Sequence, residues 1–305
     1  MAWQALVKVT KMTNLQINDI TFKRTSDFEF NPVLKIYNTQ TNEFNNIPLD
    51  NYTFNLKLSE QKFCTGYNKD GQHFECKFQN KIDEKTAGQC SYCERIQGFK
   101  SAFIMGDLTH ERSTEILSQE YYIYLAYFEP GVIKVGTANV ARSNLRLMEQ
   151  DCLLYCFIAK GTGYQIQKLE HLISKKLGIT ETVKSNHKFK YLNIKPNVEL
   201  AKSKLSSTFD KVISLFADTE YSDLFFEEYI FKNLTDTNTV FFPEKYKKIQ
   251  DINLFGEFKT LRGRYLLIEN IEIAAFDINY LIGRFIEDYI QDYQYNFFEE
   301  QLSLL

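Results

Sequence analysis

The chain lacks the long apolar runs that membrane proteins and exported proteins need. No window approaches eighteen uncharged apolar residues, and the opening stretch MAWQALVKVTKM has no apolar segment typical of a signal peptide. Proline is scarce, with 5 in 305 residues, and no low-complexity linker or internal repeat is present. We therefore expect a folded cytoplasmic protein without a membrane segment. A hydrophobic content of 44% is enough for two or three cores.

Two familiar catalytic signatures are absent as well. No glycine-rich loop of the Walker type occurs, because Gly161-Thr162-Gly163 is a plain turn ahead of a predicted helix. The four histidines are scattered and form no zinc-hydrolase motif; they are His73, His110, His171 and His187. These absences argue against a P-loop nucleotide hydrolase and against a histidine-ligated zinc hydrolase.

Charge is unevenly distributed along the chain, although the net charge of the whole is only −3. Residues 131–202 carry 12 Lys and Arg against 5 Asp and Glu, whereas residues 203–305 carry 10 against 18. A basic middle segment favours contact with phosphates, and nucleic acid is the partner we expect. The alternative is that this segment faces the acidic C-terminal third.

The composition divides the chain into five regions. Short alternating runs separated by Asn- and Thr-rich turns predict a small N-terminal sheet, and a β pattern returns near the C-terminus before an acidic tail rich in Tyr and Phe. That tail, from Phe285 to Leu305, is predicted to be a helix that covers a sheet, or a face that binds a protein partner. The regions are a β segment (1–60), a cysteine segment (61–120), a core domain (121–200), a helical segment that includes Phe225 to Ile230 (201–250) and a β segment with the tail (251–305).

Four of the six cysteines fall in the second region. In a reducing compartment they are better explained as metal ligands or buried thiols than as disulfides. Cys90 and Cys93 have the two-residue spacing that lets two thiolates of one turn bind the same ion, and Cys64 and Cys76 precede them. Four thiolates with no open position predict a structural zinc site. Ordinary buried thiols remain an alternative, and so does His73 as a ligand in place of Cys76.

The other two cysteines, Cys152 and Cys156, lie on a strand-like segment. We interpret them as core thiols that share one face of that strand.

Residues 121–170 alternate between strand-like and helix-like segments. They predict a strand, a Glu129-Pro130-Gly131 turn, a second strand, a helix, a third strand and a second helix. Period-two facing puts Tyr122, Tyr124 and Ala126 on one side of the first strand, and Val132, Lys134 and Gly136 on one side of the second.

Glu170 lies on the second helix beside the apolar stripe of Ile166, Leu169 and Ile173. At the helical rotation per residue it falls about 40° from Ile166. Burying a carboxylate at this position destabilises the fold unless a metal, a cation or hydrogen bonds neutralise or satisfy its charge. The alternative is that Glu170 bends outward to Lys168 or another lysine.

The first helix carries two arginines next to its apolar face. Ala141, Leu145 and Met148 are predicted to form that face, while Arg142, Arg146 and Glu149 follow one another along the adjacent face. The fork of Arg146 suits a phosphate oxygen. Its alternative role is a salt bridge with Glu149, which would stabilise the helix little.

This order of elements, with Tyr124, Val135-Gly136, Arg146 and Glu170, resembles the core of GIY-YIG nucleases. The resemblance implies an α+β fold with a small antiparallel sheet in a three-layer core. It also implies roles: Glu170 holds Mg²⁺ or Mn²⁺, Arg146 steadies the phosphate, and Tyr124 orients or activates the attacking water.

Two positions depart from the nuclease motif. Tyr122 stands where that motif has Gly, and Lys134 stands where it has its second Tyr. A hydroxyl proposed to act on the water is therefore missing, and Lys134 is expected to be a base only if burial lowers its pKa, or otherwise a phosphate contact. Asn186 is the candidate for the late asparagine of the pattern.

A wider resemblance spans most of the chain. It is similar to DUF2797, a bacterial family of proteins whose function is not settled, and this resemblance implies a GIY-YIG-like core preceded by a cysteine site. The segments that carry it are Cys64, Cys76, Gln89 to Cys93, Tyr124 to Ala126, Lys134 to Thr137, Arg146, Glu149-Gln150 and Gly256 to Leu266.

Three functions follow as hypotheses. The first is a zinc-containing protein that binds DNA or RNA through Lys134, Arg142 and Arg146, with cleavage weakened or lost. The second is a divalent-metal-dependent endonuclease that uses Tyr124, Lys134, Arg146 and Glu170. The third is a protein-interaction module based on the acidic C-terminal third.

Overall fold

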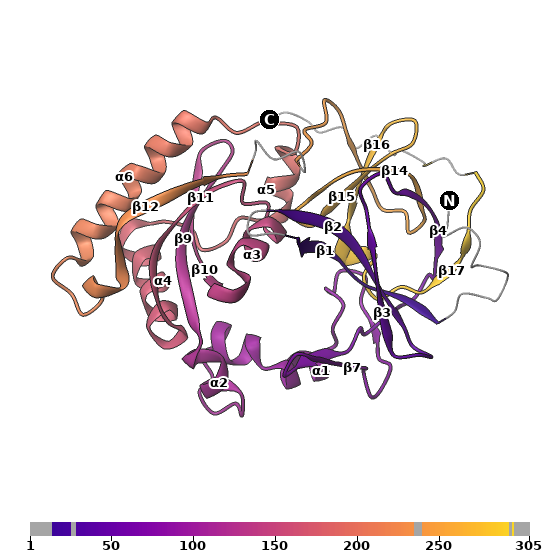
Figure 1. The fold of residues 1–305 in the computed structure, drawn as a ribbon, viewed down its shortest axis with the longest axis horizontal. Helices are drawn as coiled ribbons and strands as arrows, with labels where there is room; N and C mark the ends of the chain where they lie inside the picture. The colour runs from indigo at the N-terminus through magenta and orange to yellow at the C-terminus, as the bar shows by residue number, and fades with distance from the viewer. Residues whose placement is uncertain (1–13, 26–28, 235–239, 293–294, 296–305) are drawn as a thin grey trace.

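The protein has a mixed α+β fold, as expected from the sequence. The computed structural model describes residues 14–25, 29–234, 240–292 and 295. In Figure 1 a helix-flanked sheet lies on one side and a second unit built of strands on the other, and the segment with α1 and α2 joins them below. None of the helices in these described ranges has both the length and the apolar composition needed to cross a membrane.

The helix-flanked sheet has four antiparallel strands in the order β10-β9-β11-β12. Their bounds are Glu120–Phe128 (β9), Val132–Asn139 (β10), Leu154–Thr162 (β11) and Phe225–Asn233 (β12). After β10 come η2 (Val140–Arg142) and α3 (Ser143–Glu149), and α4 (Gly163–Leu177) follows β11. The predicted order of strands and helices over residues 121–170 is therefore observed.

Each face of this sheet is covered by different helices. On one face, Ile166, Leu169 and Ile173 of α4 are buried together with residues of α6 (Val198–Phe216). A capping box between Thr162 and Gln165 begins α4, and Gly178 in the left-handed conformation ends it. On the opposite face, Leu147 of α3 packs in the cluster that contains Tyr124, so the predicted period-two facing of β9 is confirmed.

The second unit contains strands from both ends of the chain. Its larger sheet has the order β13-β16-β15-β14-β4-β17, so the N-terminal strand β4 lies between two C-terminal ones. The two predicted β segments, at the N- and C-terminal ends of the chain, thus pair in one sheet. The bounds are Thr53–Leu58 (β4), Lys247–Ile249 (β13), Leu254–Arg262 (β14), Tyr265–Glu269 (β15), Ile273–Asp277 (β16) and Ile286–Tyr289 (β17).

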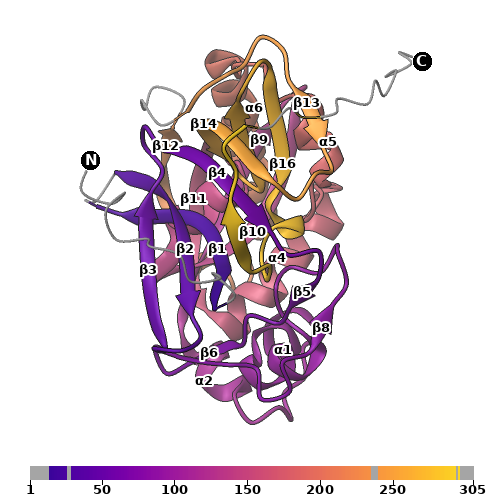
Figure 2. The same ribbon diagram turned by 90° about the vertical axis from the view of Figure 1, so that its right-hand side faces the viewer.

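A three-stranded sheet packs on the same core as the larger sheet. It consists of β1 (Leu15–Arg24), β2 (Phe30–Asn38) and β3 (Glu43–Pro48). Met148 of α3 is buried in that core too, so α3 lies between the two units. Figure 2 shows β1–β3 beside the larger sheet, with the cysteine segment below both.

The remaining elements are short. They are β5 (Lys62–Phe63), β6 (Tyr67–Lys69), β7 (Gln72–Phe74), β8 (Lys81–Ile82), α1 (Ser91–Gln97), η1 (Lys100–Ile104), α2 (Ser113–Ser118), α5 (Ser185–Lys190), η3 (Ser222–Leu224) and η4 (Ile278–Tyr280).

Three predictions about local structure are wrong. Residues 225–230 belong to strand β12 and not to a helix, because they pair with β11, and Tyr229 and Phe231 face the α6 core while Ile230 between them is exposed. The tail prediction fails at Ile286–Tyr289, which is β17, while residues 296–305 lie outside the described part.

The third concerns the paired core thiols. Cys152 and Cys156 are both fully buried, as predicted, but they do not share a face. Cys156 packs on the α4 and α6 side of the sheet, and Cys152 packs on the α3 side, because Cys152 precedes β11.

Candidate metal centre and basic site

The four cysteines of the second region form one compact cluster. The sulfurs of Cys64, Cys76, Cys90 and Cys93 all lie within 4.8 Å of one another, and Cys76 Sγ lies 3.9 Å from Cys90 Sγ. In a tetrahedral site with metal–sulfur bonds of about 2.3 Å, the sulfurs are about 3.8 Å apart. The donor set therefore fits a metal ion, and no other group of three or more His, Cys, Asp or Glu side chains comes together in this way among the described residues.

Local turns bring these sulfurs together. Cys64 follows β5, Cys76 follows β7, and Cys90 and Cys93 belong to the first turn of α1. Gly66 has a positive φ of 80°, and a side chain there would collide with the carbonyl of Phe74, so glycine lets the chain fold back at this point.

Hydrogen bonds prepare one of the thiols for ionisation. The Cys90 N–H donates to Cys64 Sγ at 3.2 Å, and Asn80 Nδ2 donates to Cys90 Sγ at 3.3 Å. Although burial acts to raise it, the pKa of the Cys90 thiol is lowered to about 6 by the Asn80 amide, the Cys93 N–H and the neighbouring thiols. The thiolate is the form that binds metals.

His73 is not part of this cluster. Its ring packs between Tyr37 and Phe44, at 4.9 Å from each ring centroid. Burial lowers its pKa to about 4, and Lys35 adds to the effect. The alternative in which His73 replaces Cys76 is wrong, because Cys76 supplies a sulfur to the cluster.

The second site is a buried hydrogen-bond network around Gln150. Tyr124 Oη donates to Gln150 Oε1 at 2.9 Å, and Lys134 Nζ donates to the same oxygen at 2.6 Å and to Tyr124 Oη at 2.9 Å. Tyr124 is fully buried and Lys134 is 8% exposed. The Tyr124 ring lies across Gly136, where a side chain would collide with it, so the glycine leaves room for the network.

Burial changes the acidity of both partners in this network. It raises the pKa of Tyr124 well above its ordinary value, and it lowers the pKa of Lys134 to about 8. The lysine therefore stays mostly protonated at neutral pH but loses its proton more readily than an exposed lysine, while the tyrosine stays protonated.

Arg146 is exposed on α3, beside this network. No ion pair or hydrogen bond of its side chain is found among the described residues, and its charge interacts with Lys134 and Tyr124. The alternative salt bridge to Glu149 is not formed. Glu149 instead accepts from Arg142 and from Thr21 Oγ1, each at 3.1 Å.

The apolar face of α3 also differs from the prediction. Leu147 and Met148 are buried and Leu145 is partly buried, whereas Ala141 is exposed. The reason is that residues 140–142 form a 3-10 turn, which shifts the angular positions that an α-helix would give.

Glu170 is half-buried on α4 and reaches the same region. Burial and the charge of Glu181 raise its pKa to about 7, while Lys134 and a hydrogen bond from Thr137 oppose that shift. The predicted residues thus gather around β9 and β10, but Arg146 alone of the four is exposed. Asn186 lies exposed on α5, and none of the described contacts links it to this group.

Two residues of the network were not predicted to act in it. Gln150 was noted only as a neighbour of Glu149, and Lys188 on α5 was not noted at all. Lys188 Nζ donates to the backbone carbonyl of Gln150 at 2.5 Å. No sequence signal marks Lys188, because only the fold brings α5 against the end of α3.

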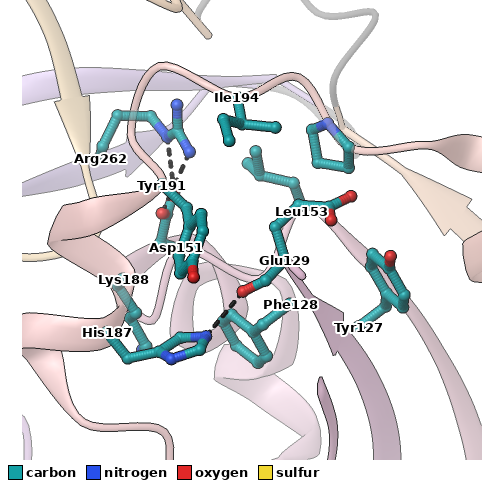
Figure 3. A pocket seen from close by; sticks show the side chains of 11 residues that line it. Tyr127, Phe128, Glu129, Asp151, Leu153, His187, Lys188, Tyr191, Ile194 and Arg262 are labelled. Atoms are coloured by element: carbon teal, nitrogen blue, oxygen red, sulfur yellow. Dashed lines mark hydrogen bonds and ion pairs between the residues drawn. The ribbon is translucent and has the colours of Figure 1, made fainter. Parts of the chain in front are cut away.

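A small pocket adjoins Lys188 (Figure 3). Its volume is about 30 Å³, which is room for one or two water molecules. The buried pair of Arg262 and Asp151 forms one wall, and His187 Nε2 lies 2.6 Å from the Glu129 carbonyl on another. This space is too small for a nucleotide, so a nucleic acid would have to bind the outer surface that Arg146 and Arg142 present.

No family model, no curated protein and no solved structure matches this chain. The resemblances to DUF2797 and to the GIY-YIG nucleases therefore depend on the residues that carry them.

Proposed function

We propose that this chain is a zinc-containing nucleic-acid-binding protein with a GIY-YIG-like core whose cleavage activity is weakened or lost. The observation that carries the proposal is the state of Tyr124. Its hydroxyl is fully buried and bonded to Lys134 and Gln150, while Arg142 at the start of α3 and Arg146 on α3 remain exposed. Such a site keeps the groups that contact phosphate and lacks one that could activate water.

The architecture supports the GIY-YIG-like part of this proposal. The hairpin of β9 and β10 precedes the arginine-bearing helix α3, and β11 pairs with β9 before the glutamate-bearing helix α4 begins. The positions that the resemblance singles out come from four different elements and interact electrostatically around Lys134.

Zinc is the metal that best suits the cysteine cluster. Four thiolates in a closed, mostly buried tetrahedron match structural zinc sites, and no ligand position is left open for a substrate. All six cysteines are free, which supports a reducing compartment, and we place the protein in the cytoplasm on that ground.

Weak cleavage follows from the chemistry of the network. A water-activating base must accept a proton from water that reaches it. Tyr124 does not fit that role because burial raises its pKa. Lys134 is a poor base because it is only 8% exposed and is already bonded to Gln150.

Binding to nucleic acid should depend strongly on salt. We expect affinity for DNA or RNA to fall steeply between about 50 and 200 mM salt, because phosphate contacts release counterions. Lys134 was predicted to contact nucleic acid, but it is buried in the Gln150 network, so the exposed Arg142 and Arg146 are the pair to change. The double substitution Arg142→Gln with Arg146→Gln should weaken binding and lower the slope of log affinity against log salt by about 2. Anisotropy titrations over a salt series measure both.

A matched control removes two charges elsewhere. Lys202→Gln with Lys211→Gln changes two exposed lysines of α6, which lies on the opposite face of the sheet. This control should leave the slope nearly unchanged. If the wild-type chain binds no nucleic acid at low salt, the proposal is wrong and the protein-interaction module, with a partner on the C-terminal third, replaces it.

An endonuclease is the second candidate, and the convergence of Lys134, Arg146 and Glu170 favours it. We expect little or no cleavage of single-stranded, duplex or branched substrates with Mg²⁺ or Mn²⁺. Should cleavage occur, Glu170→Ala should reduce its rate by orders of magnitude because the carboxylate would hold the metal. Glu181→Gln changes a neighbouring carboxylate as the control. Robust cleavage lost only in Glu170→Ala would overturn our preference for a binding protein.

A further inference from the structure

Four aromatic rings form a continuous strip on the α3 side of the four-stranded sheet. Tyr155 and Phe157 on β11, Tyr122 on β9 and Phe226 on β12 are neighbours, with successive ring centroids 5.5, 4.5 and 6.1 Å apart. We call these four residues the aromatic strip. It crosses three adjacent strands, since β11 lies between β9 and β12.

The two ends of the strip differ in how they are covered. Tyr155 is buried under α3, and its hydroxyl donates to Asn144 at 3.2 Å. Tyr122 and Phe226 are only half-buried, and neither belongs to a buried hydrophobic cluster in the described part of the chain. Beyond Phe226 on the same face, Ile230 is 69% exposed.

Tyr122 is the residue that makes this open end aromatic. It occupies the position where the nuclease motif has glycine, so the departure from that motif adds a ring to the sheet surface. Its ring contacts are with Phe157 and Phe226, which are both half-buried.

Charged groups border the strip on two sides. Arg142, the residue before α3, and Arg146 on α3 lie on either side of Asn144 at the buried end, and both arginines are exposed. At the open end, Lys160 lies opposite Tyr122 and pairs with Glu120 at 2.9 Å. Glu228 is exposed on β12 between Phe226 and Ile230, and it is the acidic group that a phosphate on this path would meet.

We propose that the aromatic strip is a stacking platform for single-stranded nucleic acid, with Tyr122 and Phe226 under unpaired bases and Arg142 and Arg146 on the phosphates. This inference rests on the proposed function and names its substrate class. Rings on a sheet surface stack on bases that are splayed out, whereas bases in a duplex are stacked on each other and inaccessible.

The test compares strands and duplexes of the same sequence. Labelled DNA and RNA of about 12 nucleotides cover the site size of single-strand-binding sheets. Wild-type protein should bind the strands more tightly than the duplexes, and Tyr122→Ala or Phe226→Ala should each weaken strand binding by about 5- to 150-fold. Tyr122→Phe and Phe226→Tyr keep the ring and should bind like wild type, while Glu228→Gln should bind more tightly.

A matched control and an independent readout keep the test decisive. Phe99→Ala removes a ring that is 40% exposed and stacked on Phe103 outside the strip, so it should not alter binding. Phe226→Trp in a Trp3→Phe background should lose tryptophan emission when an unlabelled strand binds, because the base stacks on it.

The outcomes separate this inference from the proposed function. Equal binding of strands and duplexes, or equal effects of Tyr122→Ala and Phe99→Ala, overturns the platform while the basic surface stands. No binding of any nucleic acid by the wild-type chain removes the proposed function and the platform with it.

Discussion

One zinc ion per chain should be found in protein purified without chelator, and its removal should unfold residues 64–93 of the cysteine segment. Structural zinc sites of this kind bind with apparent free energies of about 10–16 kcal/mol, and that energy is also folding energy. The part of the segment around the thiols should be affected most, since its hydrophobic cluster has only the thiols themselves and Ile82 as buried members. Residues 102–117 of the same segment pack in the core beneath α4 and should stay folded. Elemental analysis gives the stoichiometry, and proteolysis or hydrogen exchange with and without chelator reports the loss of structure.

Two cysteine substitutions make this expectation specific. Cys93→Ser removes a ligand that is fully buried and should abolish stoichiometric zinc. Cys156→Ala is the matched control, because that thiol is equally buried but lies in the core beneath α4 and α6. The control can lower stability, yet it should keep its zinc. The cluster would be an ordinary group of buried thiols if wild-type protein purified without chelator contained no zinc. The same conclusion would follow if the Cys93→Ser protein kept its full zinc content.

The cysteine cluster could be predicted because its information is local. Cys90 and Cys93 stand one turn apart, and glycines allow the preceding loops to fold back. The period-two facing of β9 and the apolar stripe of α4 are local patterns too, and the structure confirms both.

What the sequence did not reveal depends on contacts between distant segments. The Phe225–Asn233 segment has aromatic residues at positions that fit either a helical or a two-residue period, and its pairing with β11 decides for a strand. Lys188 and Arg262 reach the end of α3 from 38 and 111 residues away along the chain. Helix and strand periodicities relate only residues that are close in sequence, so they cannot predict contacts at these separations.

Gln150 and its neighbour Asp151 are the point at which the units of the protein meet. Gln150 accepts from Tyr124 and Lys134 through its side chain and from Lys188 through its carbonyl. Asp151 has a positive φ of 58° and directs its carboxylate to Arg262 of the second unit. A side chain added at Gly263 would press on the backbone of Asp151, so the turn after β14 fits closely against α3.

Arg262→Met should destabilise the protein by about 3–5 kcal/mol, because it leaves the Asp151 carboxylate buried without its partner. In the native protein Arg262 Nε and Nη2 donate to the two oxygens of Asp151 at 2.6 and 3.1 Å, and Nη1 donates to the Leu192 carbonyl at 3.1 Å. The side chains of the two residues are 4% and 8% exposed. Urea unfolding at neutral pH measures the loss.

The double variant and a surface control separate this pair from a general effect of losing an arginine. Arg262→Met with Asp151→Asn removes both charges and should recover part of the stability, since no unpaired charge stays buried. Lys259→Met breaks pairs with Glu257 and Glu269 whose carboxylates are about half exposed, and it should cost no more than about 1 kcal/mol. Because Asp151 adjoins Gln150, Arg262→Met should also loosen the network at Lys134 and weaken nucleic-acid binding in protein that is still folded. If Arg262→Met lost no more stability than Lys259→Met, the contact between Arg262 of the second unit and Asp151 would not stabilise the end of α3.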